Sequence, residues 1–540
     1  MKPTRHIVFL ALCSLFLLPA QANDTVYVSG EIQHEGLLDW SPVMYHSNSY
    51  VDLSVHYVND SNNAHFHSLR ASTRGELTQW PMPGFEADFG GYGMSHLSVA
   101  AAFDWGEITV GDVYGQFGSG MLFNVYEDRA MGIDGALRGG KIELTPWKGL
   151  HFTLIGGKQR RYWSCYKDRA FGWNYGRDAV IAGDVELHIE QWSRRMQEND
   201  MHLTIGGSYV SKYEQPDTIM FINDGMYMYN LPRWVGAGEV RAQWQMRGWN
   251  VMAEYAHKAN DPCIENHYSY DDGNALLVSA GYSRKGLSVL GQMKMTRNMA
   301  FRSERQRNGI AGRINHMPAF SQQHTYALAA LYPYATQYVP GELAFQGEVL
   351  YTWPRKSPMG GRYGTTMKWS GSHIRGLYGK NENYTDVNME LHKRLSKSWW
   401  LNAVLMYQAY NQLAVEGHGG MIRSGIAVVD ARVHVTNKVS MRGELQYLYT
   451  PDYEGQWFFA LYEVSLWQRL TLSGQWMYNI GGTTEATHEH YYTFSATYSH
   501  AAHRLTAGYT KTRDGFNCSG GVCRWVPKME GVSLNYSFTW

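Results

Sequence analysis

The sequence lacks the features of several large protein classes. After its first 22 residues it has no run of about twenty apolar residues, which argues against membrane-spanning helices. Its 48 basic and 48 acidic residues give a formal net charge of +0, so charge indicates no nucleic-acid partner. Helical periodicity is scarce, and no Pro-rich or low-complexity linker divides the chain. These absences favour a single all-β domain.

Signatures of catalysis and of bound cofactors are also missing. No Gly-x-Ser-x-Gly motif occurs, and no spacing of Ser, His and Asp selects a catalytic trio. The cysteines lack the CxxC spacing of structural zinc sites. The Gly-rich stretch 111–121 has no Lys-Ser/Thr ending, which argues against a nucleotide-binding loop. We predict no enzyme, no cofactor and no metal site, and keep an enzyme at a membrane rim as a third hypothesis.

The start of the chain indicates export. A short basic stretch precedes an apolar run from Ile7 to Leu18, which ends near Ala20-Gln21-Ala22. This order is typical of a secretory signal peptide, which we place at residues 1–22. Residues 23–540 then form the mature domain.

The mature sequence repeats one unit, a stretch of alternating apolar and polar side chains followed by a connection. Residues 51–57, 97–103 and 505–509 show this alternation, as expected of strands between lipid and water. Short connections at 146–149, 246–249, 284–286, 436–438 and 467–469 contrast with long ones at 78–95, 116–136, 164–179, 262–273, 297–323 and 408–423. We predict a transmembrane antiparallel β-barrel of about 20–26 strands in the outer membrane of a Gram-negative bacterium, with a lumen that is open or plugged by its own loops.

The final stretch, residues 531–540, alternates strictly. Tyr536, Phe538 and Trp540 share the apolar face of an extended strand, while polar residues share the other face. Such a terminal strand is similar to the assembly signal of bacterial outer-membrane barrels. We predict that the barrel-assembly machinery recognises these aromatics and that Trp540 lies at the periplasmic edge.

The densest unusual segment is residues 111–140. Its glycines permit tight backbone turns, and its charged residues can pair inside a narrowed lumen. We interpret it as a loop that folds back and constricts the barrel, and a specific ligand site is the alternative. The constriction residues are Glu127, Asp128, Arg129, Asp134 and Arg138.

Several motifs in the first third of the chain resemble a known family. They are Val28-Ser29-Gly30, Pro83-Gly84-Phe85-Glu86, residues 111–120, Tyr126-Glu127-Asp128-Arg129, Gly132-Ile133-Asp134, Leu137-Arg138-Gly139-Gly140 and Gln159-Arg160-Arg161-Tyr162-Trp163. Over residues 25–165 the chain is similar to an uncharacterised family of Bacteroidetes outer-membrane β-barrels, a domain-of-unknown-function family. The resemblance implies location and fold, and it supplies no substrate or catalytic residues.

One cationic cluster ends a predicted strand. Lys158, Arg160 and Arg161 are followed by Tyr162 and Trp163. Such a combination binds anions or stacks on sugar rings, or it anchors a barrel at the membrane interface. We favour the interface anchor, because aromatic girdles and cations that extend toward the headgroups are general in barrels.

A second cationic cluster lies in a predicted external loop and comprises Arg297, Arg302, Arg305 and Arg307. These side chains can bind phosphates of lipopolysaccharide, although solvated loop charges are the favoured interpretation. A later stretch, residues 332–342, is compatible with a turn, a loop or a break in the strand pattern.

The spacing of two cysteines suggests one disulfide bond. Cys518 and Cys523 enclose Ser-Gly-Gly-Val, which lets the chain turn, so we predict a disulfide in an external loop. Cys165 and Cys263 fall in two other predicted external loops, and their pairing stays open.

Two functional hypotheses lead. The first is a channel or transporter for small polar solutes, because the strand count is large and catalytic motifs are absent. The second is a closed barrel that serves as a scaffold or subunit of a larger envelope complex. Expected partners are outer-membrane lipid and lipopolysaccharide, the barrel-assembly machinery and, under the second hypothesis, envelope proteins.

Overall fold

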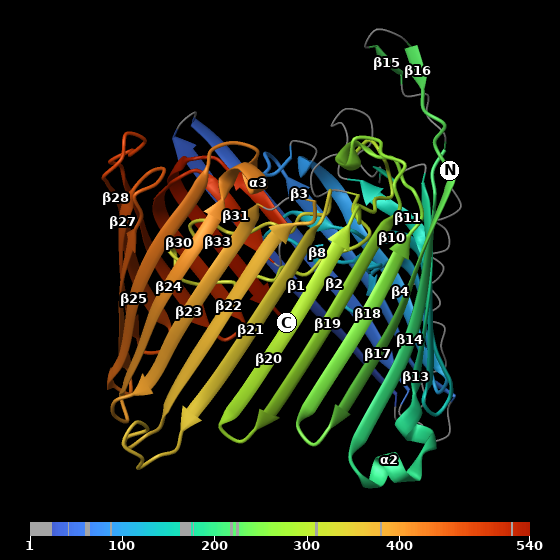
Figure 1. The fold of residues 1–540 in the computed structure, drawn as a ribbon, viewed down its shortest axis with the longest axis horizontal. Helices are drawn as coiled ribbons and strands as arrows, with labels where there is room; N and C mark the ends of the chain where they lie inside the picture. The colour runs from blue at the N-terminus through green and yellow to red at the C-terminus, as the bar shows by residue number, and fades with distance from the viewer. Residues whose placement is uncertain are drawn as a thin grey trace.

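Twenty-four long antiparallel strands close into a barrel (Figure 1). This computed structural model describes residues 24–40, 43–59, 65–86, 89–161, 174–175, 178–215, 220–222, 226–307, 312–378, 381–519 and 522–540, so the predicted signal peptide lies outside the described residues. Each barrel strand pairs with the next one along the chain, and the last pairs with the first. The predicted fold class is confirmed, and the strand number lies within the predicted range.

The barrel strands are between 8 and 16 residues long. They are β1 (Thr25–Trp40), β2 (Val43–Val58), β3 (Phe66–Thr78), β4 (Gly91–Phe103), β5 (Gly106–Val113), β10 (Leu137–Trp147), β11 (Leu150–Arg161), β13 (Ala179–His188), β14 (Met201–Tyr213), β17 (Trp234–Met246), β18 (Trp249–Lys258), β19 (Gly273–Arg284), β20 (Leu287–Arg297), β21 (Glu342–Trp353), β22 (Thr365–Gly376), β23 (Glu382–Arg394), β24 (Trp399–Asn411), β25 (Met421–Thr436), β26 (Val439–Tyr449), β27 (Gln456–Leu466), β28 (Leu470–Gly481), β29 (His490–His500), β30 (His503–Thr512) and β33 (Met529–Thr539).

Shorter elements occupy the connections. They are β6 (Gly115–Gln116), β7 (Asn124–Val125), β8 (Glu127–Asp128), β9 (Ile133–Asp134), β12 (Asn174–Tyr175), η2 (Ile189–Trp192), α2 (Arg194–Glu198), β15 (Met220–Ile222), β16 (Met226–Met228), η3 (Ile264–Asn266), α3 (Gln412–Glu416), β31 (Gly515–Ser519) and β32 (Val522–Val526). Among the described residues, no helix has both the length and the apolar character needed to cross a membrane.

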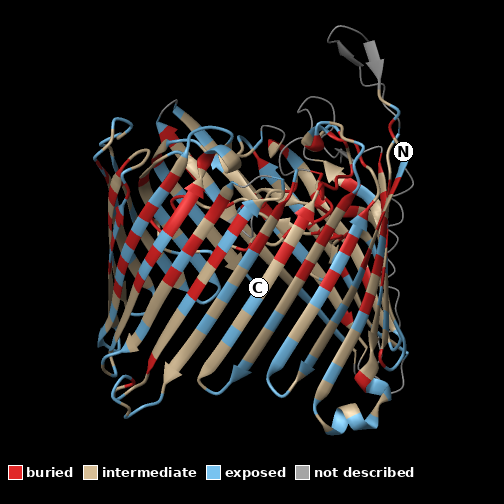
Figure 2. Cartoon of the chain, in the orientation of Figure 1, coloured by how far each residue is buried: buried red, intermediate tan, exposed pale blue. Residues whose placement is uncertain are grey.

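Alternation with period two explains why these segments form a barrel wall. Along β24, Leu405 is 54% exposed and points outward, whereas its neighbour Met406 is 4% exposed and points into the barrel. Figure 2 shows the same alternation of buried and more exposed residues along the strands. Because the interstrand ladders pair the backbone N–H and C=O groups around the wall, apolar side chains can face lipid without leaving backbone groups unpaired.

Connections of different length lie on opposite rims. All five predicted short turns lie on one rim, called here the short-turn rim, and most longer connections lie on the other, the long-loop rim (Figure 1). Trp540 pairs with Gly30 at the short-turn rim. Exposed Trp side chains mark this rim as an aromatic girdle at headgroup level. Examples are Trp147, Trp249, Trp399 and Trp467.

The shortest ladder of the wall joins β4 to β5. β3 pairs with β4 as far as Thr78–Gly91, but β5 pairs with β4 only as far as Ser98–Gly111. Residues 91–97 therefore have no β5 partner in the described structure. At the point of separation, the Leu97 N–H donates to Asp112 Oδ2 at 2.7 Å, and Asp112 also pairs with Arg138.

Candidate functional site

Two connections from the long-loop rim enter the lumen. The first inserted segment, residues 114–136, joins β5 to β10. The second inserted segment, described at residues 298–307 and 312–341, joins β20 to β21. Figure 1 shows these chains between the front and rear walls, and Figure 2 shows most buried residues at their level. The segments bind each other through their backbones: the Asn124 N–H donates to Ile314 O, and the His316 N–H donates to Gly120 O, both at 2.9 Å.

Apolar side chains from both segments form a core inside the barrel. Met121, Leu122 and Phe123 of the first segment and Phe301 of the second are all 0% exposed. They belong to one hydrophobic cluster that includes inward side chains of the wall, such as Ile155 on β11. The predicted inward-folded loop plug is therefore confirmed, and it consists of two segments.

The first segment is bound to β2 and β3 by a network of charges. Arg74 Nε lies 2.6 Å from Asp52 Oδ1, and Arg129 Nη2 lies 3.0 Å from Asp52 Oδ2. Glu127 accepts from both arginines. The Arg129 guanidinium also lies 3.8 Å from the centre of the Tyr50 ring. Each charge has an opposite charge in reach, which offsets the cost of burial.

A second ionic contact fixes the end of the first segment. Asp134 pairs with Arg160 of β11 and accepts from the Tyr114 hydroxyl at 3.0 Å. Burial acts to raise the pKa of Asp134, but Arg160 and the Ala136 backbone N–H outweigh it and lower the pKa. Glu76 of β3 lies 3.7 Å from Arg160, so this cluster links β3 to β11 across the gap between β4 and β5.

The two remaining predicted constriction residues, Asp128 and Arg138, stabilise a turn of the first segment and the adjacent wall. Asp128 accepts from the Met131 N–H at 3.1 Å and shapes a turn of the first segment. Arg138 lies on wall strand β10 and not in the first segment. It pairs there with Asp112 of the neighbouring strand β5. The structure thus brings Glu127, Arg129 and Asp134 into the lumen, while Arg138 contributes to the wall beside them.

The contacts of the cationic cluster on β11 do not fit the favoured interpretation, an anchor at the membrane interface. Lys158 is exposed, but Arg160 pairs with Asp134, and Arg161 pairs with Glu304 of the second segment. Arg160 and Arg161 therefore bind the inserted segments and do not extend to a membrane interface. Tyr162 and Trp163 lie outside the described residues.

Buried lysines hold the second segment. Lys212 of β14 donates to Arg302 O at 2.7 Å and pairs with Asp261 at 2.6 Å. Lys294 of β20 pairs with Glu342 at 2.7 Å and donates to Pro318 O. All four charged side chains are 0% exposed, so neither partner of a pair can be lost without leaving a buried charge.

The prediction that the loop arginines are solvated charges is wrong for Arg302 and Arg305. Arg302 and Arg305 are each 1% exposed. Arg302 lies 2.7 Å from Glu265, and Arg305 lies 3.2 Å from both Glu214 and Asp261. They are interior ion-pair partners, because the loop that carries them turns into the barrel. The signal for this was the apolar character of the same loop at residues 299–301 and 327–332, which an external loop does not need.

The lumen nearer the short-turn rim is polar. Lys368 of β22 lies 3.1 Å from Glu348 of β21, and these inward side chains keep 21% and 33% of their surface exposed. Arg442 of β26 lies 3.0 Å from Asp430 of β25. Below the inserted segments, the inner wall therefore presents solvated charges of both signs.

Two of the described cysteines form a disulfide, and the third is a buried free thiol. Cys518 and Cys523 form the predicted disulfide between β31 and β32. Cys263 is 1% exposed, and burial raises the pKa of its thiol. Cys165 lies outside the described residues, so the structure does not test whether it pairs with Cys263. No group of three metal-ligating side chains occurs within the described ranges.

The closed wall, aromatic girdle and inserted segments define a transmembrane β-barrel whose lumen is narrowed by its own loops. The chain belongs to the family of unknown function DUF6029, which matches residues 6–540 and so extends well beyond the resemblance over residues 25–165.

Solved barrels share low sequence identity with this chain. The siderophore receptor PirA from Pseudomonas aeruginosa is 10% identical, over 96% of this chain and 81% of that one, with a TM-score of 0.43. A mutant of the ferric enterobactin receptor PfeA from the same organism is 9% identical over 96% and 81%, with a TM-score of 0.44. The P pilus usher PapC pore is 8% identical over 96% and 99%, with a TM-score of 0.38. No curated protein matches the chain.

Proposed function

We propose that this protein is a channel for small polar solutes in the outer membrane of a Gram-negative bacterium. The observation that carries the proposal is the lumen near the short-turn rim, where Lys368 and Glu348 are inside the barrel and still partly exposed. Charges of both signs suit neutral or zwitterionic polar solutes better than ions of one sign. The inserted segments narrow the path, which sets an upper limit on solute size.

The test is conductance of the purified, refolded protein in planar bilayers. Discrete current steps, together with faster swelling of protein-containing vesicles in small sugars than in large ones, would support a size-limited channel. An intact barrel that insulates at every voltage and pH would contradict it. Heat-dependent gel mobility shows in each case that the barrel has folded.

A closed scaffold is the second candidate, because apolar side chains of both inserted segments pack against inward side chains of the wall inside the lumen. Its test is gentle extraction from native membranes followed by affinity isolation. Stoichiometric companions combined with absent conductance would favour the scaffold. A protein recovered alone that conducts would favour the channel.

A further inference from the structure

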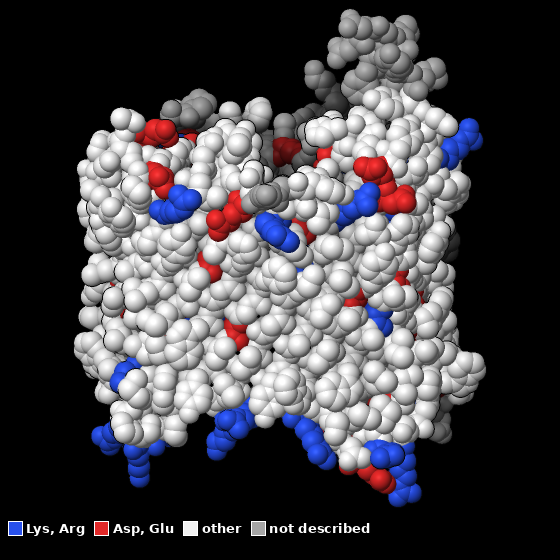
Figure 3. Space-filling view, in the orientation of Figure 1, with Lys and Arg blue, Asp and Glu red and all other residues white. Residues whose placement is uncertain are grey.

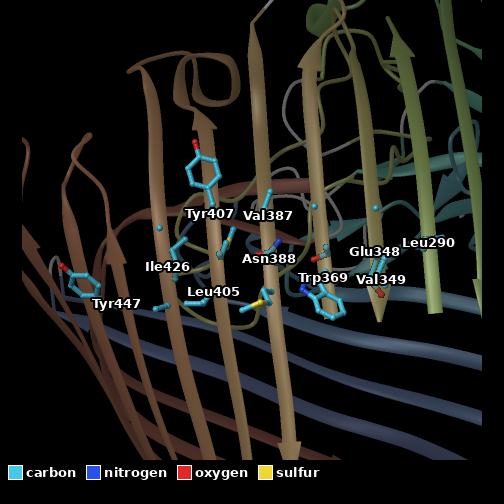
Figure 4. Close-up of a pocket in the computed structure, with 17 residues that line it drawn as sticks. Leu290, Glu348, Val349, Trp369, Val387, Asn388, Leu405, Tyr407, Ile426 and Tyr447 are labelled. Atoms are coloured by element: carbon cyan, nitrogen blue, oxygen red, sulfur yellow. The ribbon is translucent and has the colours of Figure 1, made fainter. Parts of the chain in front are cut away.

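A hollow of about 900 Å³ lies on the outer face of the wall across β20 to β26 (Figure 4). Its lining includes Trp369, Leu405, Tyr407 and Tyr447, which are all exposed and alternate with inward side chains. Most lining residues, such as Val387 and Tyr407, carry outward side chains, and those with inward side chains, such as Glu348, are their neighbours along the same strands. The hollow therefore lies on the lipid-facing side of the wall.

Strand register explains the hollow. Gly347 of β21 stands opposite Gly371 of β22, and Gly425 of β25 stands opposite Tyr407 of β24, all on the outward face. A Cβ added at Gly347 would meet its nearest atom at 3.9 Å, and one at Gly425 would meet none within 4 Å. The missing side chains leave free space between the larger residues Trp369 and Tyr407.

Cations lie directly below this hollow at the short-turn rim. The β21–β22 turn carries exposed Arg355, Lys356 and Arg362, and Lys393 ends the outward face of β23. Residues 354–364 and 395–398 contain no Asp or Glu. No ion pair involves these four cations within the described part of the chain. Figure 3 shows basic side chains along this rim, with acidic ones gathered near α2.

The spacing between the hollow and the cations suits one lipid. Val387, which lines the hollow, and Lys393 are six residues apart on the same face of β23, or about 20 Å along the strand. At a tilt of about 40° this corresponds to roughly 15 Å of depth, half of the hydrocarbon core. Trp353 and Trp399 flank the cations and lie at the aromatic girdle, so the charges lie at headgroup level, where lipid phosphates are found.

We propose that the hollow and these cations form a binding site for one anionic phospholipid of the leaflet that borders the short-turn rim. Arg355, Lys356 and Lys393 bind the phosphate headgroup, and an acyl chain lies in the hollow beside Gly347 and Gly371. The proposal does not depend on whether the lumen conducts.

The test uses the full mature protein in phosphatidylcholine nanodiscs that contain phosphatidylglycerol with a photoreactive group in one acyl chain. Mass spectrometry then locates the crosslinks. We expect them to concentrate on residues 365–371 and 387–393, and unlabelled phosphatidylglycerol to compete better than phosphatidylcholine. Gly347→Leu with Gly425→Leu, which fills the hollow, should reduce these crosslinks about ten-fold, as should the combined Arg355→Gln, Lys356→Gln and Lys393→Gln changes.

Matched controls separate the site from general lipid contact. Gly443→Leu adds bulk on the outward face of β26 outside the lining, where a Cβ also meets no atom within 4 Å. Arg375→Gln with Arg423→Gln removes two exposed cations near the opposite rim. Both controls should leave the crosslinks unchanged. Crosslinks spread evenly around the wall, equal competition by phosphatidylcholine, or binding of an acidic soluble protein in place of lipid would overturn the proposal.

Discussion

The two inserted segments share one apolar core but differ in the burial of the charges that bind them to the wall. The first segment contacts β2 and β3 mainly through partly exposed ion pairs, with 33% of the Arg129 side chain exposed. The second is held by buried charges: Arg305 pairs with Asp261, and Lys294, whose partner is Glu342, donates to Pro318 O. Screened pairs contribute little free energy each, whereas a buried pair is costly to break. We therefore expect the second segment to be the permanent part of the plug and the first to be the more easily released part.

Removal of the second segment should have the largest effect. Replacement of residues 299–339 by a short Gly-Ser linker removes the contribution of the second segment to the apolar core inside the lumen. We expect single-channel conductance in planar bilayers to rise several-fold. As a control, shortening the connection between β14 and β17, which lies outside both inserted segments, should leave conductance unchanged. Equal conductance of the deletion variant and the parent would show that this segment does not set the narrowest point.

Lys294→Met should be the most damaging point substitution. It leaves the Glu342 carboxylate buried without its cation, which costs about 3–5 kcal/mol of unfolding free energy. Urea unfolding in lipid vesicles, followed by tryptophan fluorescence, measures the loss. Adding Glu342→Gln should recover much of it, because the orphaned charge is then removed. A single variant as stable as the parent would show that the pair does not anchor the second segment.

Arg129→Gln should have a smaller effect. It removes the contacts of Arg129 with Asp52 and Glu127, but Arg74 still pairs with both carboxylates. We expect a loss of about 1 kcal/mol that shrinks at high salt, since the pair is partly exposed. Arg194→Gln on α2, where the ion pair with Glu198 is far more exposed, is the control and should change nothing measurable. A salt-independent loss of several kcal/mol would remove the proposed difference between the two segments.

The last expected effect is a pH dependence of stability where the second segment contacts the wall. Burial, together with the nearby charge of Glu304, raises the pKa of Asp178 to about 6. The folded state then holds its proton more tightly than the unfolded state, so this group lowers stability as pH rises from about 4 to about 6. Asp178→Asn should remove that decline and be more stable than the parent at pH about 8, as measured by urea unfolding across pH. A parallel decline in both proteins would exclude Asp178 as its source.

Sequence patterns predict the wall of this protein well and its interior only in part. The strands follow from period-two alternation, because each stands between lipid and water, and the turns follow from connection length. The charged residues 127–134 signalled the first inserted segment, since a loop with this many opposite charges can pair inside a lumen. Residues 297–323 are interpreted from sequence as an external loop because of their length, and the arginines in this loop as solvated charges.

What the sequence could not supply was the set of partners on distant strands. Arg302 and Arg305 are buried because Glu265, Glu214 and Asp261 approach them from other loops, and no local spacing encodes those contacts. The same holds for Arg160, whose partner Asp134 belongs to the first segment. Sequence gives the charge of such residues, but only the closed barrel determines which opposite charge meets them.

The short ladder between β4 and β5 gives the wall a seam. Seven residues of β4 have no ladder partner on β5 in the described structure, and side chains of the first segment and of β11 link the wall across this gap. A barrel under stress should open first where the fewest backbone bonds must break, so amide hydrogens of residues 91–97 should exchange with solvent before those of other strands. Release of the first segment would then loosen the wall as well as the lumen.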